Sequence, residues 1–169
     1  MNDVTHKKNT LLEKAADFGG FFSSKDAVAA GYATNNHSYF VRTGAWERYS
    51  RGVYRISGYP MPSRPEYYAA AIYLRGREGE TQGVFTLASA AAIYEVGDFM
   101  PSQIFVAVRP DFDCKVMPDN MIIHRSKTAL EEYELIDGLP VASSLSMIKD
   151  FLIQKTSSEE ERSEEHTSE

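Results

Sequence analysis

Residues 23–56 constrain the fold of this chain more than any other segment, because they place a basic hairpin directly after two short helical patterns. The first helical stretch ends at Gly31 and the second at Gly44, as glycine commonly ends helices. Two strand-like runs, Trp46–Tyr49 and Val53–Ile56, then flank the turn sequence Ser-Arg-Gly. This order predicts a winged helix-turn-helix at the N-terminus of an α+β chain.

Polar residues at the starts of the two helices support this assignment. Ser23 stands three residues before Asp26, which predicts an N-cap with an acidic residue in the first turn. Thr34 is the predicted N-cap of the second helix. Upstream, the apolar spacing of residues 10–18 predicts a further helix that stops at the glycine pair 19–20.

The second helix has one apolar face and one polar face. His37, Phe40 and Val41 fall on the face that can pack inward, and His37 is expected to be a partly buried, hydrogen-bonded histidine. The opposite face offers amide, hydroxyl, phenol and guanidinium groups, which can bind base edges and phosphates. The residues of this helix predicted to contact DNA are Thr34, Asn35, Asn36, Ser38, Tyr39 and Arg42. The alternative is an ordinary polar surface facing solvent.

The hairpin adds positive charge directly after this helix. Arg48, Arg51 and Arg55 stand against a single acid, Glu47. A wing that contacts phosphates or the minor groove requires such a charge pattern, so these three arginines complete the predicted DNA-binding set.

The charge of the chain is distributed unevenly. The net charge is −6, which by itself argues against a nucleic-acid partner. Residues 1–64, however, carry 9 Lys or Arg against 5 Asp or Glu, whereas residues 65–169 carry 9 against 19. This asymmetry indicates a basic binding module joined to an acidic part, and ordinary uneven surface charge is the alternative.

The run GYATNNHSYFVRTGAWERYSRGVYRI resembles the helix-turn-helix and wing of the AbiEi-type antitoxins. Their wing carries a G-x-L-E-R-x-x-R-G-V-Y pattern, and this chain matches it from Gly44 to Tyr54 with Trp46 in place of the aliphatic residue. A weaker resemblance extends over residues 10–154. It implies an operator-binding autorepressor of a type IV toxin-antitoxin (abortive infection) system that counteracts a nucleotidyltransferase-type toxin. Binding to inverted repeats would suit a homodimer.

The second half predicts a small mixed α/β domain. A proline-rich linker, residues 59–65, separates it from the winged domain of residues 1–58. Residues 66–158 then contain helical patterns at 66–74, 86–94 and 145–154 and strand patterns at 103–108 and 120–124. The acidic residues 159–169 end in RSEEHTSE, which matches the translation expected from a short-read sequencing adapter. We interpret this tail as artefactual; a solvated acidic tail is the alternative.

No residue pattern predicts a catalytic or cofactor site. Asp111, Asp113 and Lys115 form a D-x-D-x-K cluster whose two carboxylates could hold a metal ion in a nuclease, but its Pro- and Asp-rich context favours an exposed turn. The single Cys114 and the lack of an apolar leader predict a cytoplasmic protein without disulfides. Besides the DNA-binding regulator, a protein-interaction module that uses the winged helix only as a scaffold remains an alternative.

Overall fold

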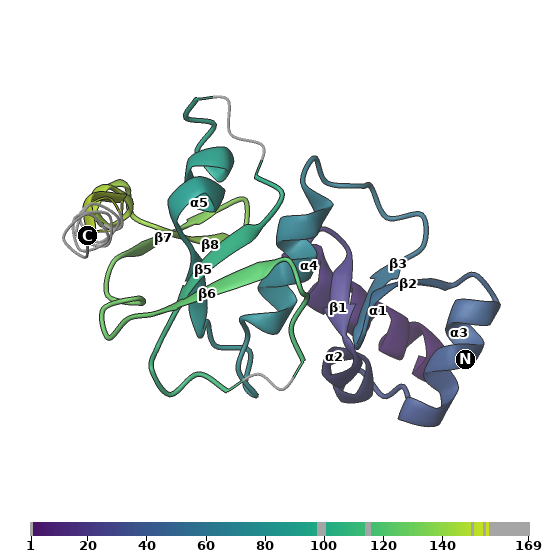
Figure 1. Cartoon of the computed structure of the whole chain (residues 1–169). Helices are drawn as coiled ribbons and strands as arrows, with labels where there is room; N and C mark the ends of the chain where they lie inside the picture. The colour runs from purple at the N-terminus through teal and green to yellow at the C-terminus, as the bar shows by residue number, and fades with distance from the viewer. Residues whose placement is uncertain (1, 98–100, 114–115, 150, 154, 156–169) are drawn as a thin grey trace, which may run out of the picture. The chain divides into compact units, whose positions relative to one another are not determined.

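The protein is a mixed α/β chain with two separate sheets, as expected from the sequence (Figure 1). The computed structural model describes residues 2–97, 101–113, 116–149, 151–153 and 155. Its contacts group the chain into two compact units, of which the first covers the chain up to Glu80 together with two short later segments. Each unit is described separately below. The tail of residues 159–169, Cys114 and Lys115 lie outside the described residues.

The first unit contains helices on both sides of a small sheet. In chain order its elements are α1 (Asn2–Ala16), β1 (Phe21–Ser23), α2 (Ser24–Ala29), the 3-10 helix η1 (Thr34–Asn36), α3 (His37–Arg42), β2 (Trp46–Ser50), β3 (Val53–Ile56) and α4 (Pro65–Tyr73). The hairpin of β2 and β3 confirms the two predicted strands. The short strand β1 was not predicted, because its sequence shows no alternation of apolar and polar residues. It pairs with β3, so the three strands form an antiparallel sheet in the order β1-β3-β2.

The predicted N-cap of α2 is confirmed, whereas the predicted N-cap of the next helix is wrong. Ser23 caps α2, and its side chain and that of Asp26 form a reciprocal capping box. Thr34 does not act as an N-cap, because it is the first residue of the 3-10 helix; Ala33 precedes that helix and no side chain caps it. Helix α3 continues directly from this turn.

The sheet of the first unit is covered on both faces. Strand partners share a face, so Phe22 lies beside Tyr54 and both point into a core with Leu11, Ala15 and Trp46. On the other face, Phe21 and Val53 pack against Ala69 and Ile72 of α4. Alternation along each strand therefore determines which side chains face α1, α2 and α3 and which face α4.

Helix α4 belongs to the first unit, although the predicted domain boundary at residues 59–65 assigned it to the second. Its apolar side chains bury against β1 and β3, as described above. The proline-rich segment is thus a connection within the first unit, and the division between units falls after Glu80. Proline content indicated a break in secondary structure, which is not the same as the end of a core.

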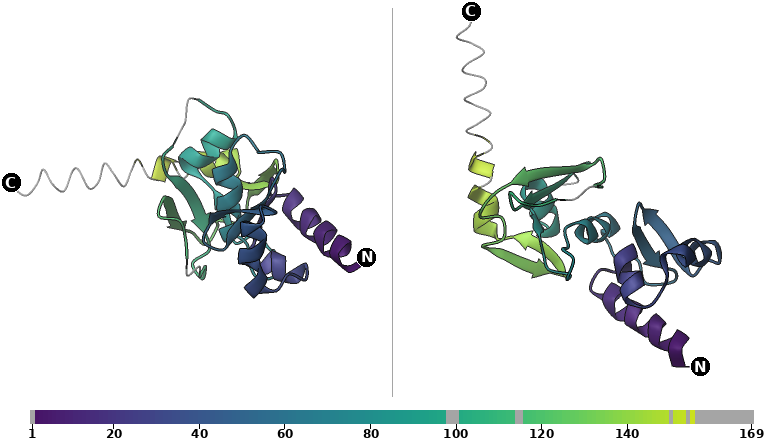
Figure 2. Two further views of the ribbon diagram at one scale, coloured as in Figure 1. Left: turned by 90° about the vertical axis from the view of Figure 1, so that its right-hand side faces the viewer. Right: turned by 90° about the horizontal axis from the view of Figure 1, so that it is seen from below.

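The second unit is built on a mixed five-stranded sheet in the order β6-β5-β4-β8-β7. Its elements are β4 (Gly83–Phe85), α5 (Leu87–Ile93), β5 (Ile104–Val108), β6 (Met121–Arg125), β7 (Tyr133–Ile136) and β8 (Leu139–Ala142). Residues 144–149 and 151–153 are helical, which agrees with the predicted last helix. Helix α5 packs against β5 (Figures 1 and 2). In the described part of the chain, no helix has the length and apolar character that crossing a bilayer requires.

Candidate nucleic-acid interface

The polar face predicted for the second helix is exposed in the structure. Side chains of η1 and α3 that reach solvent are those of Thr34, Asn35, Asn36, Ser38, Tyr39 and Arg42. The Tyr39 ring is 52% exposed and lies under the Arg42 guanidinium, 5.8 Å from its carbon to the ring centre. This surface offers hydrogen-bond donors and acceptors, one aromatic ring and one positive charge.

The inner face of α3 rests on a cluster of aromatic rings. Trp46 is buried, and its ring centre lies 4.8 Å from that of Phe40 and 5.4 Å from that of His37. His37 is only 3% exposed, and its Nε2 lies 3.2 Å from the carbonyl oxygen of Tyr32. The expectation of a buried, hydrogen-bonded histidine is confirmed. Burial of the rings fixes which side of α3 remains available to a partner.

Two of the three hairpin arginines, Arg48 and Arg51, are exposed. Arg48 lies on the side of α3, and Arg51 lies in the hairpin turn. Arg48 pairs across the strands with Tyr54, whose ring contacts His37 of α3, so Arg48 lies on the sheet face that carries α3. Arg51 occupies the turn between β2 and β3, where Gly52 adopts a φ of +74°. Neither guanidinium forms an ion pair with another residue of the described chain.

Arg55 does not join them. It alternates with Tyr54 in β3, so its side chain lies on the sheet face of Val53, and it is 4% exposed. Its Nη1 donates to Glu47 Oε2 at 3.0 Å, and its Nη2 donates to the carbonyl oxygen of Tyr59. The predicted role of Arg55 in binding phosphate therefore does not agree with its position. Two signals in the sequence distinguish Arg55 from Arg48. Alternation along the strands places the two arginines on opposite faces of the sheet, and Glu47 lies opposite Arg55.

One cation near the hairpin was missed by the sequence prediction. The Ser24 amide donates to the carbonyl oxygen of Gly52 at 3.0 Å, which places the start of α2 beside the hairpin turn. Lys25 follows directly and is exposed. A positive charge in the first turn of a helix opposes the helix dipole, so Lys25 does not stabilise α2 through that dipole.

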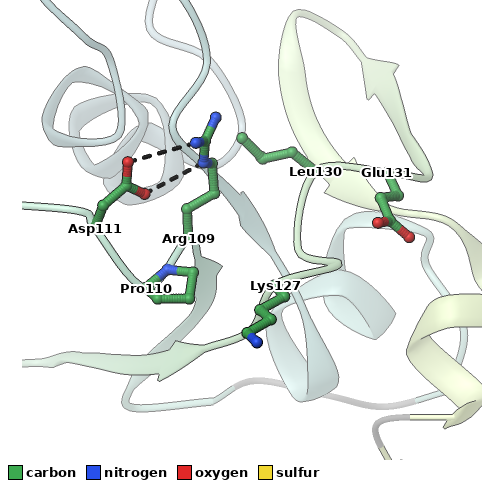
Figure 3. Close-up of a pocket in the computed structure, with 6 residues that line it drawn as sticks. All are labelled: Arg109, Pro110, Asp111, Lys127, Leu130 and Glu131. Atoms are coloured by element: carbon green, nitrogen blue, oxygen red, sulfur yellow. Dashed lines mark hydrogen bonds and ion pairs between the residues drawn. The ribbon is translucent and has the colours of Figure 1, made fainter.

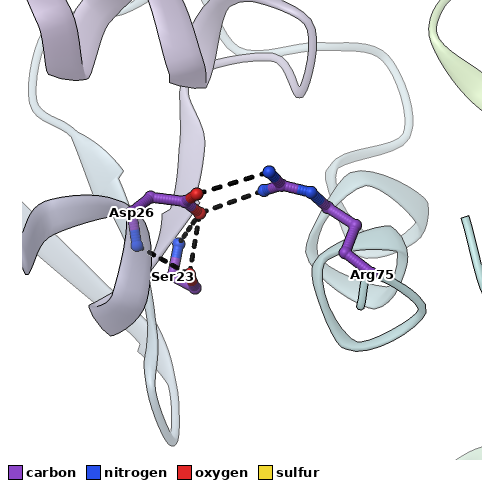
Figure 4. A network of polar contacts seen from close by, with 3 residues as sticks. All are labelled: Ser23, Asp26 and Arg75. Atoms are coloured by element: carbon purple, nitrogen blue, oxygen red, sulfur yellow. Dashed lines mark hydrogen bonds and ion pairs between the residues drawn. The ribbon is translucent and has the colours of Figure 1, made fainter. Parts of the chain in front are cut away.

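A largely buried ion pair holds α2 to the segment that follows α4 (Figure 4). Arg75 donates from Nη1 and Nη2 to the two carboxylate oxygens of Asp26, at 3.0 and 3.3 Å. Ser23 donates to Asp26 Oδ2 from its amide at 2.8 Å and from its hydroxyl at 2.7 Å. Burial by itself would raise the pKa of Asp26, but the hydrogen bonds from Ser23 and the Arg75 charge outweigh it, so the pKa lies below its usual value.

The second unit has an open depression of about 450 Å³ on its surface (Figure 3). Its lining residues are Arg109, Pro110, Asp111, Lys127, Leu130 and Glu131. Arg109 and Asp111 pair with each other at 3.2 Å, and Lys127 and Glu131 add one charge of each sign, so the lining has no net charge. Asp111 was part of the alternative metal cluster. Among the described residues, no three His, Cys, Asp or Glu side chains are grouped so that they could hold a metal ion.

The comparison with protein families agrees with the predicted resemblance over the N-terminal part of the chain. Residues 9–57 match the family model described as a transcriptional regulator, AbiEi antitoxin. The match ends after β3, before α4 begins. No curated protein matches the sequence.

Proposed function

We propose that this chain, whose residues 9–57 match the AbiEi antitoxin regulators, is a sequence-specific DNA-binding repressor of its own operon. One observation carries the proposal: the polar face of α3 is exposed on the same side of the sheet as Arg48, while its apolar face is anchored on Trp46. Helices α2 and α3 with the β2-β3 hairpin then form a winged helix-turn-helix. Family membership of this segment is consistent with that role but does not specify the operator.

In the proposed complex, α3 enters the major groove. Asn35 and Arg42 offer the side-chain groups that pair with adenine and guanine edges, and Ser38 and Tyr39 add hydroxyl groups. Arg48, Arg51 and Lys25 neutralise backbone phosphates on either side of the helix. Arg55 is left out because its guanidinium is buried. A homodimer would place two such helices on the half-sites of an inverted repeat.

The same family suggests a toxin as the protein partner of this chain. AbiEi antitoxins counteract a toxin, so we propose that a nucleotidyltransferase-type toxin is the protein whose effect this chain opposes. Without the tail of residues 159–169, the second half of the chain still carries more acids than bases, 8 Lys or Arg against 13 Asp or Glu in residues 65–158, so it is the part least suited to DNA. Restored growth of cells that express the toxin encoded beside it, on co-expression of this chain, is the expected result. Unchanged toxicity at equal protein levels would contradict this part of the proposal.

The DNA-binding proposal is tested by titrating the full chain against its own upstream DNA and against a scrambled duplex, each at two salt concentrations. We expect tighter binding to the upstream DNA and weaker binding to both duplexes as salt rises, because phosphate contacts release counterions. Equal, weak binding to both duplexes would exclude a specific regulator.

Arg42→Ala and Arg51→Ala are expected to weaken DNA binding in different ways. Loss of Arg42, on the polar face of α3, should cost about 1–3 kcal/mol on the operator and relax the preference over the scrambled duplex. Loss of Arg51 should weaken binding to both duplexes equally and reduce the salt slope by about one unit, because it removes one phosphate contact. Fluorescence anisotropy at four salt concentrations measures both. Lys127→Ala, in the second unit, is the matched control, and equal behaviour of all three variants would contradict the assignment.

Arg55→Met should instead lower stability and leave the DNA contacts intact. The variant loses the hydrogen bond to the Tyr59 carbonyl oxygen and the ion pair to Glu47. Glu47 is 52% exposed and can be hydrated, so we expect a loss of only about 1–2 kcal/mol in the free energy of unfolding. Denaturant unfolding and a DNA titration below the unfolding transition measure the two effects. A reduced salt slope with unchanged stability would return Arg55 to the binding surface.

A further inference from the structure

The turn of the β2-β3 hairpin is held by a side chain from α4, which lies outside the segment that matches the family. The phenol of Tyr73, the last residue of α4, donates to the carbonyl oxygen of Arg51 at 2.9 Å. The hydroxyl of Ser50 lies 2.8 Å from the same phenol oxygen. Because the Tyr73 hydrogen is used on Arg51, the Ser50 hydroxyl donates to Tyr73, which then both accepts and donates at the turn.

The Tyr73 bonds act at the end of an irregular hairpin, whose other supports include the ring of Phe21, 5.0 Å from that of Tyr49. Strands β2 and β3 are joined by only two residues, and the pairing shifts register between Arg48 and Ser50. A bulge of this kind twists a hairpin and changes the direction of its end. One further bond, from the Ser24 amide to the Gly52 carbonyl oxygen, connects the turn to α2. Tyr73 thus holds the Arg51 side of the turn, and Ser24 holds the Gly52 side.

The ring of Tyr73 is positioned firmly enough to serve this purpose. Helix α4 packs through Ala69 and Ile72 onto Phe21 and Val53, and the Tyr73 ring packs against the same cluster. The phenol oxygen is therefore fixed relative to the sheet, and so is the backbone from which the exposed Arg51 side chain projects. A flexible arginine on a fixed backbone loses less conformational freedom on binding than one on a mobile turn.

We propose that Tyr73 is a positioning residue for DNA binding, acting through Arg51 at the tip of the hairpin. This inference rests on the proposed function, and it extends the DNA-binding module beyond the matched residues 9–57 to include α4. Tyr73 does not contact DNA. It orients the turn so that the Arg51 guanidinium reaches a phosphate.

Tyr73→Phe in the full chain tests the inference, because it removes the hydroxyl and keeps the packed ring. We expect affinity for the upstream DNA to fall by about 3- to 10-fold, the equivalent of one hydrogen bond, and the salt slope to decrease by up to about one unit. Ser50→Ala, which removes the donor to the phenol but keeps the bond to Arg51, should have a smaller effect. Tyr94→Phe is the matched control, since the Tyr94 hydroxyl likewise donates to a backbone carbonyl, that of Ala142 in the second unit.

A double-mutant cycle separates positioning from a general loss of stability. If Tyr73 acts through Arg51, then Tyr73→Phe has no further effect on affinity or salt slope in the Arg51→Ala background. An equal effect in both backgrounds, or a lower unfolding temperature with an unchanged salt slope, would overturn the inference while leaving the DNA-binding proposal in place. Absence of salt-dependent binding by the unmodified chain would overturn both.

Discussion

Phe22→Ala is expected to lower the free energy of unfolding of the first unit by about 3–5 kcal/mol, the usual cost of removing a buried aromatic ring from a core. Phe22 is fully buried in β1 and lies between the helices and the sheet. Its ring centre is 5.0 Å from that of Trp46 and 5.8 Å from that of Tyr54. Trp46 in turn supports Phe40 of α3, so the cavity would also loosen the base of the exposed helix.

Urea unfolding followed by tryptophan fluorescence measures this effect selectively. Trp46 is the single tryptophan of the sequence and lies in the first unit, so its emission reports on that unit. Tyr39→Ala is the control, since it truncates a ring that is 52% exposed and should change stability by about 0.5 kcal/mol or less. An unfolding midpoint of Phe22→Ala equal to that of the unmodified chain would show that this core does not stabilise the unit.

Asp26→Asn is expected to cost about 2–4 kcal/mol at neutral pH, because it leaves the largely buried Arg75 guanidinium without its counterion. The cost is set below that of a fully buried pair because both side chains keep some contact with water. Arg75 Nε is itself buried with no hydrogen-bond partner among the described residues, so the carboxylate is the main compensation for this charge. The same substitution weakens the capping box at the start of α2.

The effect of Asp26→Asn should depend on pH. The pKa of Asp26 in the folded chain lies below its unfolded value, so the unfolded state takes up the proton first as pH falls. The stabilisation is therefore complete above the unfolded pKa of about 3.9 and is lost as pH falls through the lower folded pKa. The difference in unfolding free energy between the unmodified chain and Asp26→Asn should be constant near neutral pH and shrink below about pH 4.

Asp111→Asn provides the matched comparison for this experiment. Asp111 also pairs with an arginine, but both side chains are mostly exposed, so the substitution should cost about 0.5 kcal/mol or less at any pH. Denaturant unfolding at pH 7, 5, 4 and 3 measures both variants. Equal, pH-independent costs for the two substitutions would mean that the Asp26–Arg75 pair does not stabilise the first unit.

Much of the candidate interface could be predicted from the sequence because its signals are local. The capping box of Ser23 and Asp26 lies within four residues, and the two faces of α3 follow from helical periodicity over residues 34–42. The hairpin is likewise specified by two adjacent runs and a short turn. These features need no information about distant parts of the chain, and the structure contains each of them.

Pairing between distant segments could not be predicted in the same way. Strand β1 has only three residues, and it becomes a strand because β3, about thirty residues later, supplies its partner. Strands β7 and β8 were missed in the second unit, where β8 pairs in parallel with β4. Short strands lack enough alternating positions to be distinguished from loops, and only the completed sheet satisfies their backbone groups.

The sequence by itself determined the helix order, the exposed polar face of α3 and the basic hairpin, because periodicity, capping and turn chemistry act between near neighbours. Only the tertiary structure decided how deeply Arg55 is buried, and that α4 covers the sheet and places Tyr73 at the hairpin turn. Those outcomes depend on which face of the sheet each helix covers. Which face a helix covers depends on the burial of apolar surface across the whole unit, and this cannot be read from any short segment.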